Sequence, residues 1–239
     1  MPGGPAARGI VWPVAVPAEH PGAAYLEALY EMGEEDIPPV QARLAEWMGV
    51  SAASVSEAVK RLVRDGLVVN RNRHLELTDR GLRLAETLVR RHRLVEHFLI
   101  RILGLPWHRA HEEAVRWEKV VSDEIEERFV ALLGDPPTCP HGNPIPGTAT
   151  PVDQSHLVPL KDVEPGRRVV LRRLTEDLEL DLDVMRFLEE SGLMPGAEIE
   201  VRRVAPDGAI ALRVAGQDVA LGAHLSDNLW VEPSGSARA

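Results

Sequence analysis

Two histidines and a glutamate stand at spacings in this 239-residue sequence that could hold a metal ion. His92 and Glu96 are four residues apart within a helical pattern of apolar residues, so both side chains project from one face, one turn apart. His111 opens the next helical segment. Two imidazoles and a carboxylate suit Fe²⁺, Mn²⁺, Co²⁺, Ni²⁺ or Zn²⁺. On spacing alone, hydrogen-bonded histidines with a purely structural role are an equally good interpretation.

Two long helices must position these residues. The first, from residue 79 to about 104, has too many apolar residues for one narrow stripe, so it must pack on more than one side. The second is expected from about residue 108 to 133, and its apolar residues would suit a subunit interface. The short turn between them favours an antiparallel pair, which leaves the distance from His111 to His92 open.

The N-terminal part has the order of elements of a winged helix-turn-helix. An amphipathic helix over residues 39–48 is followed by a turn and by a serine-capped helix over residues 51–65. In residues 67–77, apolar and polar residues then alternate on both sides of a polar turn, as expected of a two-stranded hairpin. This order favours binding of double-stranded DNA.

The second of these helices offers side chains that suit a DNA interface. Small residues at its N-terminal end let a helix enter the major groove closely, and backbone N–H groups and nearby basic side chains can reach phosphates. Glu57 differs, because a carboxylate repels phosphate but can accept from cytosine N4; it can instead point to solvent or pair with Arg61. The residues expected at DNA are Arg43, Ser51, Ala53, Ser54, Ser56, Glu57, Lys60, Arg61, Arg71 and Arg73.

Charge is unevenly distributed along the chain. The formal net charge of −10 excludes a uniformly basic surface for nucleic acid. Residues 36–90 hold nine Lys or Arg against seven Asp or Glu, a balance of +2, whereas residues 151–232 hold nine against sixteen, a balance of −7. The weak excess of +2 also fits a dimerisation or protein-binding module, so DNA binding is favoured by the order of elements rather than by charge. The net charge of −7 in residues 151–232 argues against DNA contact by the C-terminal part.

Composition also divides the chain into segments. Residues 1–20 predict a flexible arm rather than a signal peptide, because prolines interrupt their short apolar patch. Residues 135–156 are rich in proline and glycine and predict a linker. Strands dominate after it, with one helix, as in a small barrel. We therefore expect a DNA-binding domain at 21–80, a helical dimerisation and metal-binding domain at 81–134, and a C-terminal domain at 157–233.

The chain has no run of about 18 apolar residues, so no membrane span is predicted. Its single cysteine, Cys139, excludes an intramolecular disulfide framework. Both features indicate a cytoplasmic protein. Cys139 and His141 form a C-x-H pair, but inside a linker without a partner cluster this pair predicts no zinc site.

These segments resemble the diphtheria toxin repressor family of metal-dependent, iron-responsive transcriptional regulators. The resemblance covers residues 24 to about 232 and implies a mainly α protein with an N-terminal winged helix-turn-helix, a helical dimerisation domain and a small C-terminal SH3-like (FeoA-like) β domain. It implies a homodimeric repressor, not an enzyme, that binds a palindromic DNA operator, with Fe²⁺ or Mn²⁺ as the best-fitting cofactor. The resemblance rests on YLEALYEM, ARLAEWMGVSAASVSEAVKRLVRDGLV, HLELTDRG, RHRLVEHFLIRILGLPW, HEEAVRWE and GNPIPG, in the family's order and spacing.

The resemblance also assigns metal ligands. An ancillary site in the iron-responsive members takes a histidine and a glutamate of the long helix and the histidine that opens the next, which match His92, Glu96 and His111. Two residues of the SH3-like domain complete it, at the positions of Glu176 and Glu179. The second of these is commonly glutamine, so Glu179 adds negative charge. The resemblance therefore implies that this site is retained.

The primary, activating site of the family departs from its pattern here. It normally combines a methionine, a cysteine or glutamate, a glutamate and a histidine, but the sequence has Ala24, Val115, Glu118 and Lys119 at these positions. Alanine and valine cannot ligate, and a protonated ammonium has no lone pair. We expect the site to be lost, with Lys119 as a fixed positive charge near Glu118 and an altered metal dependence. In the alternative, Lys119 is solvated and Glu118 pairs with Arg116 or Lys119 at the surface.

Two other functions are compatible with the sequence. The chain could sense a different small-molecule effector in the cavity left by Ala24 and Val115, or it could bind metal with only secondary DNA affinity. Hydrolase chemistry is not expected, because there is no nucleophile motif and five protein ligands leave little open coordination.

Overall fold

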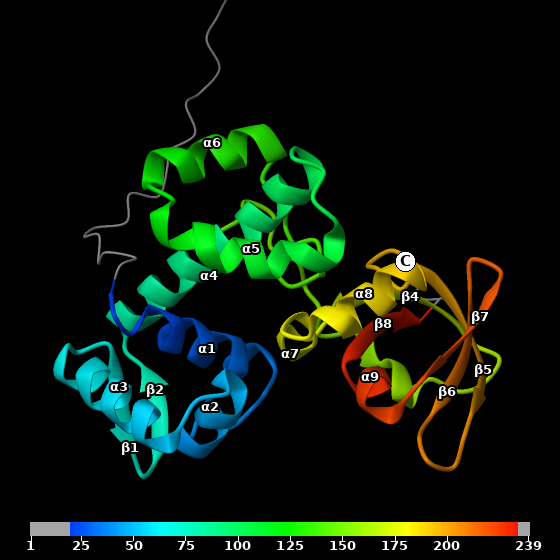
Figure 1. Cartoon of the computed structure of the whole chain (residues 1–239), viewed down its shortest axis with the longest axis horizontal. Coiled ribbons are helices and arrows are strands. Elements are labelled where there is room, and N and C mark those ends of the chain that lie inside the picture. Colours follow the sequence, from blue (N-terminus) through cyan, green and yellow to red (C-terminus); the bar gives the residue numbers. More distant parts are fainter. Residues whose placement is uncertain (1–19, 234–239) are drawn as a thin grey trace, which may run out of the picture.

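The computed structural model describes residues 20–233, so the predicted arm lies outside the described residues apart from His20. A helical body is followed by a smaller sheet domain at the C-terminal end (Figure 1). This is the mainly α architecture with a small β domain that the sequence predicts. Within residues 20–233, no helix is both long enough and apolar enough to cross a bilayer.

The N-terminal part forms the predicted winged helix-turn-helix. Ser51 caps its second helix, because its Oγ accepts a hydrogen bond from the backbone N–H of Ser54 at 3.1 Å. The hairpin turns at Asn72 and Arg73, which both have positive φ, as a two-residue turn of type I′ requires. The elements are α1 (Ala23–Glu34), α2 (Gln41–Met48), α3 (Ala52–Arg64), β1 (Val68–Arg71) and β2 (His74–Leu77).

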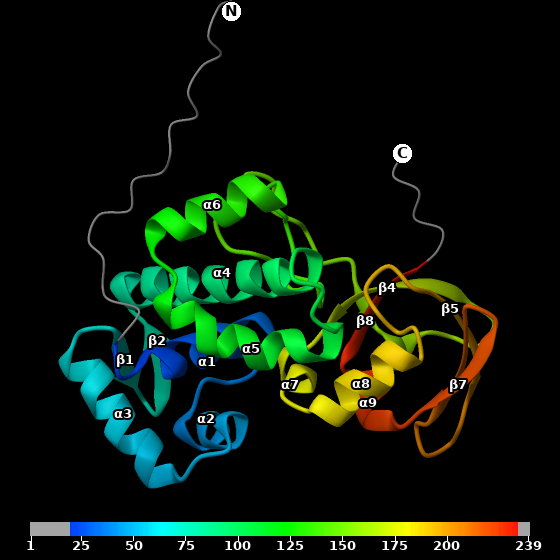
Figure 2. The same cartoon turned by 45° about the horizontal axis from the view of Figure 1, so that its top comes forward.

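Helix α4 (Asp79–Arg101) is the central element of the helical body. Thr78 caps its start by accepting from the backbone N–H of Gly81 at 3.1 Å. The helix contacts α1, α5 and α6, and Figure 2 shows α6 and α1 on opposite sides of it. This two-sided packing is the one that its apolar pattern predicts.

The prediction of a single helix over residues 108–133 is wrong. Val121 leaves the helical conformation, with ψ at 118°, and the Ser122 side chain caps a new helix by accepting from the backbone N–H of Ile125 at 3.4 Å. The interruption turns Glu118 inward, where 1% of its surface is exposed. The segment consists of a 3₁₀ turn (Trp107–Arg109), α5 (Ala110–Trp117), a second 3₁₀ turn (Glu118–Val120) and α6 (Asp123–Leu133).

The first part of the predicted linker is a packed loop. Residues 138–145, here called the 138–145 loop, are tied by a hydrogen bond from the backbone N–H of Cys139 to the carbonyl of Asn143 at 2.8 Å. His141 and Ile145 are buried, and Ile145 joins a core with α4. The loop therefore fixes the body against the next domain rather than acting as a free tether.

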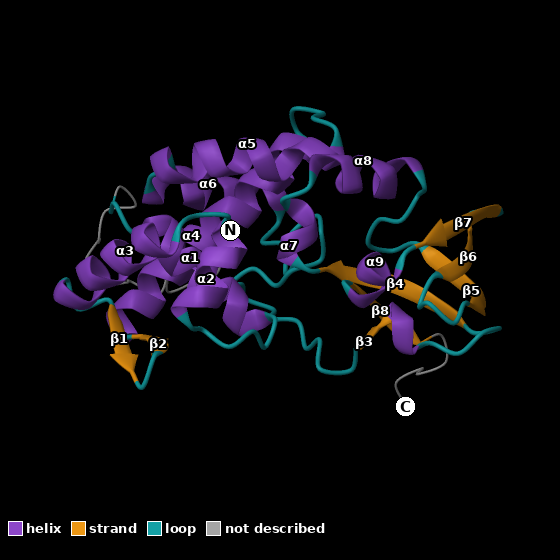
Figure 3. Cartoon of the chain, turned by 60° about the horizontal axis from the view of Figure 1, so that its bottom comes forward, coloured by secondary structure: helices purple, strands orange, loops and turns teal. Residues whose placement is uncertain are grey.

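The C-terminal domain is a six-stranded antiparallel sheet of the SH3-like kind, with strand order β3-β8-β4-β5-β6-β7. Helices α7 and α8 lie on the side of this domain that faces the helical body (Figures 1 and 3). The elements are β3 (Val158–Pro159), a 3₁₀ turn (Leu160–Asp162), β4 (Arg168–Leu174), α7 (Glu176–Glu179), α8 (Leu182–Glu190), β5 (Glu198–Val204), β6 (Ile210–Val214), β7 (Gln217–Leu221), α9 (Ala223–Asp227) and β8 (Leu229–Pro233).

Body and sheet domain share packed contacts. Trp107 of the body belongs to the apolar core of the sheet domain, and its indole N–H donates to the carbonyl of Pro140 at 3.1 Å. Glu189 of α8 accepts from the backbone N–H groups of Trp107 and His108 at 3.2 and 3.1 Å. These contacts hold α7 beside α4, where the predicted metal ligands meet.

Gly142→Ala should destabilise the protein more than a glycine replacement in open space. Gly142 has φ of 97°, and an added Cβ would lie 2.0 Å from the carbonyl oxygen of Arg172 in β4. Left-handed strain and overpacking together predict a loss of roughly 2–5 kcal/mol in the free energy of unfolding. Urea denaturation of the metal-free protein measures this loss. Gly134→Ala is the matched control, because Gly134 has φ of 82° with nothing within 4 Å of the added Cβ, and should lose only about 1–2 kcal/mol. Equal losses would contradict the close packing of the 138–145 loop on β4.

Candidate metal centre and DNA interface

The structure brings the five residues predicted for the ancillary site together. Nε2 of His92 lies 3.3 Å from Oε1 of Glu96, and Nδ1 of His111 lies 3.8 Å from the same oxygen. His111 Nδ1 is also 3.3 Å from Oε2 of Glu179, and Glu176 supplies an oxygen within 4.8 Å of the ligand atoms of His111 and Glu179. Helices α4, α5 and α7 thus direct their side chains to one region between the body and the sheet domain.

His141 and Cys139 join this group, although the sequence predicted no site for them. Nδ1 of His141 lies 3.2 Å from Oε1 of Glu96 and 2.7 Å from Oε2 of Glu179, and the Cys139 thiol lies within 4.8 Å of the ligand atoms of Glu96 and His141. The premise that the C-x-H pair lacks partners is wrong, because its partners come from α4 and α7, far away in the sequence. We call the whole group the interdomain cluster: His92, Glu96, His111, Cys139, His141, Glu176 and Glu179.

Several buried atoms of the interdomain cluster have no hydrogen-bond partner within residues 20–233. His141 Nδ1 and Glu179 Oε2 approach to 2.7 Å, yet they are not aligned as donor and acceptor. Unpaired buried polar atoms are costly, and native proteins rarely keep them without a further partner. Imidazole and carboxylate atoms that converge without pairing are the donor set of a transition-metal ion. The atoms concerned are Glu96 Oε2, His111 Nδ1, His141 Nδ1, His141 Nε2 and Glu179 Oε2.

The buried carboxylates and imidazoles of the interdomain cluster stabilise one another in their charged forms. Burial would raise the pKa of Glu96, but the charges of His141 and His92 hold it well below its usual value. Burial would likewise lower the pKa values of His92 and His141, yet Glu96 raises the first, and Glu179 with Glu96 raises the second, well above their usual value. Burial raises the pKa of the Cys139 thiol to about 12. A metal ion must therefore displace protons from the imidazoles when it binds.

Arg93 connects the interdomain cluster to the DNA-binding domain. Its guanidinium is 1% exposed and lies 2.5 Å from an oxygen of Glu176 and 2.5 Å from one of Glu34 at the end of α1, and it also donates to the carbonyl of Pro144. Arg93 thus pairs with one carboxylate of the FeoA-side helix α7 and one of α1 at the same time.

Of the residues predicted for the altered primary site, Glu118 lies beside this cluster and Lys119 approaches Glu118. Ala24 and Lys119 are exposed, and Val115 is 37% exposed. Glu118 is buried and accepts a hydrogen bond from Nδ1 of His92 at 2.6 Å, while Lys119 Nζ lies 4.0 Å from its other oxygen. The alternative of a surface pair for Glu118 is therefore wrong.

A further residue missed by sequence reasoning, Glu27 of α1, completes a second group. Its carboxylate lies within 4.8 Å of ligand atoms of His92 and Glu118, and we call these three residues the α1 cluster. Burial and the neighbouring Glu118 raise the pKa of Glu27 to about 7. Glu27 follows Ala24 by one turn, which is the signal in the sequence that could have found it. His92 belongs to both clusters, with Nε2 towards Glu96 and Nδ1 towards Glu118.

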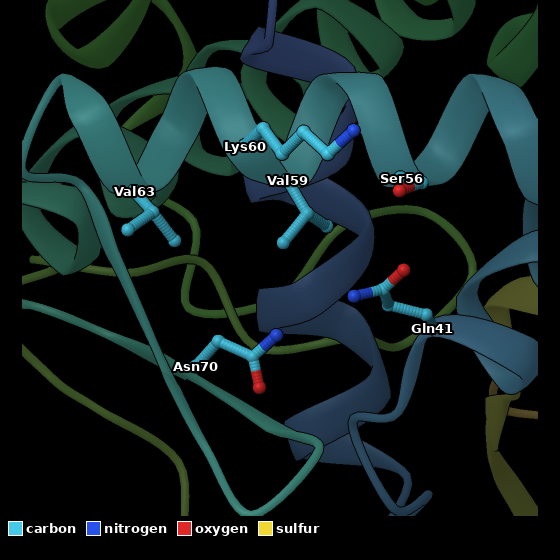
Figure 4. Close-up of a pocket in the computed structure, with 6 residues that line it drawn as sticks. All are labelled: Gln41, Ser56, Val59, Lys60, Val63 and Asn70. Carbon is cyan, nitrogen blue, oxygen red and sulfur yellow. The ribbon is translucent and has the colours of Figure 1, made fainter.

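The residues predicted for DNA contact lie on the outer side of α2, α3 and the hairpin. All ten are exposed except Ser56, which is half-buried. Lys60 Nζ donates to Glu57 at 2.9 Å, so Glu57 pairs with Lys60 rather than with Arg61. Figure 4 shows the side chain of Lys60 running along α3 in the direction of Ser56, above a hollow of about 360 Å³ between α3 and the hairpin.

Apolar side chains are exposed along α5, the turn after it, and α6. Val120 is the most exposed of them, at 80%. Exposed apolar residues that gather on adjacent elements favour a protein interface. The others on this surface, here called the α5–α6 surface, are Val115, Trp117, Ile125 and Leu132.

A winged helix-turn-helix joined to a buried cluster of imidazoles and carboxylates defines a metal-dependent DNA-binding regulator. Three family models match the chain: "Iron dependent repressor, N-terminal DNA binding domain" at residues 23–75, "Iron dependent repressor, metal binding and dimerisation domain" at 78–147, and "FeoA domain" at 158–233. The chain belongs to the iron-dependent repressor family, which includes the diphtheria toxin repressors. The predicted fold and family are thereby confirmed.

Similar proteins agree with this assignment. The chain is 40% identical over 204 residues to the iron-dependent repressor IdeR of Mycobacterium tuberculosis, covering 81% of this chain and 88% of that one. It is 37% identical over 220 residues to the diphtheria toxin repressor of Corynebacterium diphtheriae, covering 87% and 95%. Among solved structures, a manganese-dependent transcriptional repressor in complex with manganese matches with a TM-score of 0.79 at 31% identity, covering 89% and 99%.

Metal affinity should rise steeply with pH. His92 and His141 have raised pKa values, so protons compete for their nitrogens at and above the ordinary value of 6.5. Glu96 and Glu179 have lowered pKa values, remain ionised, and contribute no proton. We expect Mn²⁺ affinity to increase between pH 6 and 8 by roughly ten-fold per pH unit for each proton displaced. Calorimetric titration in two buffers of different ionisation enthalpy counts the protons. A constant affinity without proton release would contradict binding to these imidazoles.

Proposed function

We propose that this chain is a cytoplasmic transcriptional repressor that binds a palindromic DNA operator as a homodimer under the control of a divalent metal ion. The observation that carries the proposal is the position of Glu96. One of its oxygens lies 3.2–3.8 Å from nitrogens of three histidines, at the junction of the body and the FeoA domain. Helix α4 carries two of these ligands and also packs on α1 of the winged helix-turn-helix. An ion bound to α4 could therefore change the affinity of that domain for DNA.

Fe²⁺ or Mn²⁺ is the proposed ion. Imidazole and carboxylate ligands suit both ions, and Co²⁺, Ni²⁺ and Zn²⁺ would serve as surrogates. The names of the related proteins support the same choice, because they are called iron-dependent or, for the solved structure, manganese-dependent. His92, Glu96, His111, His141 and Glu179 would hold the ion, with Glu176 and Cys139 at its edge. A bound cation would replace the imidazole protons and screen the carboxylates from one another.

We further propose that the primary activating site is lost and that each chain binds one ion. Ala24 and Val115 supply no ligand atom, and the Lys119 ammonium stands 4.0 Å from Glu118. His92 cannot serve both clusters, because a histidine that ligates through Nε2 keeps its proton on Nδ1 and donates it to a carboxylate. Glu118 accepts that proton at 2.6 Å. Its role is then to orient His92 for the interdomain cluster, and Lys119 supplies the positive charge that a second ion would otherwise bring.

DNA recognition is assigned to α3 and the hairpin. The small residues at the start of α3 permit close approach to the major groove, while Arg43, Arg61, Arg71 and Arg73 are exposed where they can meet phosphates. The α5–α6 surface is the proposed dimer interface. A two-fold dimer through it would present two copies of α3 to the two halves of a palindrome.

Val120→Asp should weaken binding to a palindromic operator by disrupting the dimer. The side chain is 80% exposed in the single chain, so its replacement by a charge has little effect on folding but adds an unpaired charge to an apolar interface. A selected palindromic DNA in electrophoretic mobility shifts, with light scattering for mass, tests this. Val204→Asp is the matched control, because Val204 is 37% exposed at the end of β5 in the FeoA domain and is distant in sequence from the proposed metal ligands. The proposal fails if both variants bind palindromic DNA as the unchanged protein does, or if the unchanged protein selects no DNA.

Calorimetric titration with Mn²⁺ should find one ion per chain. Glu96→Gln should abolish this binding, because it removes the carboxylate between three imidazoles. Glu118→Gln should retain one ion with roughly 10–100-fold lower affinity, as expected for a partner that orients a ligating histidine. Glu112→Gln is the control, since Glu112 pairs with Arg116 at the surface. Two ions per chain, or unchanged binding in Glu96→Gln, would contradict the single-ion proposal.

A further inference from the structure

We propose that Glu57 and Lys60 act as one unit that recognises a cytosine–guanine base pair in the operator, with Glu57 facing cytosine and Lys60 facing guanine. This inference rests on the proposed DNA binding and deepens it by naming the base pair. It is carried by the position of the two side chains on α3, by their contact with each other, and by the hydrogen-bonding pattern of the major groove.

Glu57 and Lys60 share the outward face of α3. At 3.6 residues per turn, Ala53, Glu57 and Lys60 project within a sector of roughly 60°. The opposite face is buried, with Val55, Val59 and Leu62 at 3% exposure or less. The sector is therefore the part of the helix directed away from the core of the domain.

The residues before Glu57 allow it to come close to base edges. Ser51, Ala53 and Ser54 are exposed and have short side chains, so α3 can approach the floor of a groove at its N-terminal end. Glu57 is the first long side chain on this face, and it is the sole carboxylate within Ala52–Arg64. A long acceptor placed after a row of short side chains is positioned to reach a base rather than the backbone.

The contact with Lys60 removes the main objection to a carboxylate at DNA. An unpaired carboxylate would be repelled by phosphates, but Lys60 Nζ donates to Glu57 at 2.9 Å, and Arg61 and Arg64 stand on the same helix. The hydrogen bond from Lys60, followed by its charge, lowers the pKa of Glu57. Glu57 thus stays ionised and can only accept hydrogen bonds.

A carboxylate beside an ammonium favours a cytosine–guanine pair in the major groove. Cytosine presents the N4 amino group as a donor, and its partner guanine presents O6 and N7 as acceptors. Glutamate accepts from cytosine N4, and lysine donates to guanine O6 or N7. Thymine offers an acceptor and a methyl group, so it has nothing to donate to Glu57. Adenine has a donor, N6, but the N7 acceptor beside it would face and repel the second oxygen of a carboxylate, whereas cytosine itself has no acceptor beside N4. Glu57 and Lys60 together therefore favour cytosine–guanine over adenine–thymine.

Selection of DNA sequences from a random pool tests the inference. The unchanged protein should select cytosine–guanine at one defined position in each half of its operator, with other pairs there costing roughly five-fold or more in affinity. Glu57→Gln should lose that preference or shift it to adenine, which glutamine contacts at N6 and N7, while preferences at the other positions stay unchanged. Lys60→Ala should weaken the preference at the same position.

Glu46→Gln is the matched control, because Glu46 on α2 pairs with Arg43 over the same spacing and the same 2.9 Å distance. It removes an equal charge, so it reports any general gain in affinity, and its base preferences should equal those of the unchanged protein. Specific binding whose base preferences are identical in Glu57→Gln would overturn the inference alone. Absence of sequence-specific binding by the unchanged protein would overturn the proposed function and this inference with it.

Discussion

The buried carboxylate of Glu96 is the group on which the arrangement of the two domains depends. It is fully buried, where an isolated negative charge would be very unfavourable, and three imidazoles from α4, α5 and the 138–145 loop surround it. Each of these histidines must therefore be held in place by its own element. The capped start of α4, the packed loop and the contact between Trp107 and the sheet domain all serve that placement.

Arg93 extends this network towards DNA. It joins Glu176 of the FeoA domain to Glu34 at the end of α1, and α1 packs on α4 within the core of the winged helix-turn-helix. A second ion pair, between Glu35 and Arg173 at 2.7 Å, links the same end of α1 to β4. Two ion pairs thus connect the interdomain cluster and the FeoA domain to α1, in the domain that carries α3. Replacement of two imidazole protons by one divalent ion would leave the net charge of the interdomain cluster unchanged but would concentrate it at one point between the carboxylates, and this redistribution is what the network would transmit.

Much of the fold follows from local patterns in the sequence. The caps at Ser51 and Thr78, the i, i+4 pair of His92 and Glu96, and the alternation of the hairpin each depend on residues close in sequence. The break at Val121 was not predictable in the same way, since apolar periodicity continues through it and only the cap at Ser122 marks it. The 138–145 loop was missed because its burial depends on α4 and β4, and with it the partners of Cys139 and His141. Glu27 was missed because the family pattern directed attention to Ala24.

Ala24, Val115 and Lys119 are the positions at which we propose that this chain departs from the family's primary metal site. The two clusters share His92, so an ion in one alters the proton on which the other depends. Anomalous diffraction from a crystal soaked in Mn²⁺ separates these outcomes directly. We expect one manganese peak between Glu96 and His141, with Nδ1 of His92 still donating to Glu118. A peak coordinated by Glu27 and Glu118 beside Lys119, with none near Glu96, would contradict the central claim.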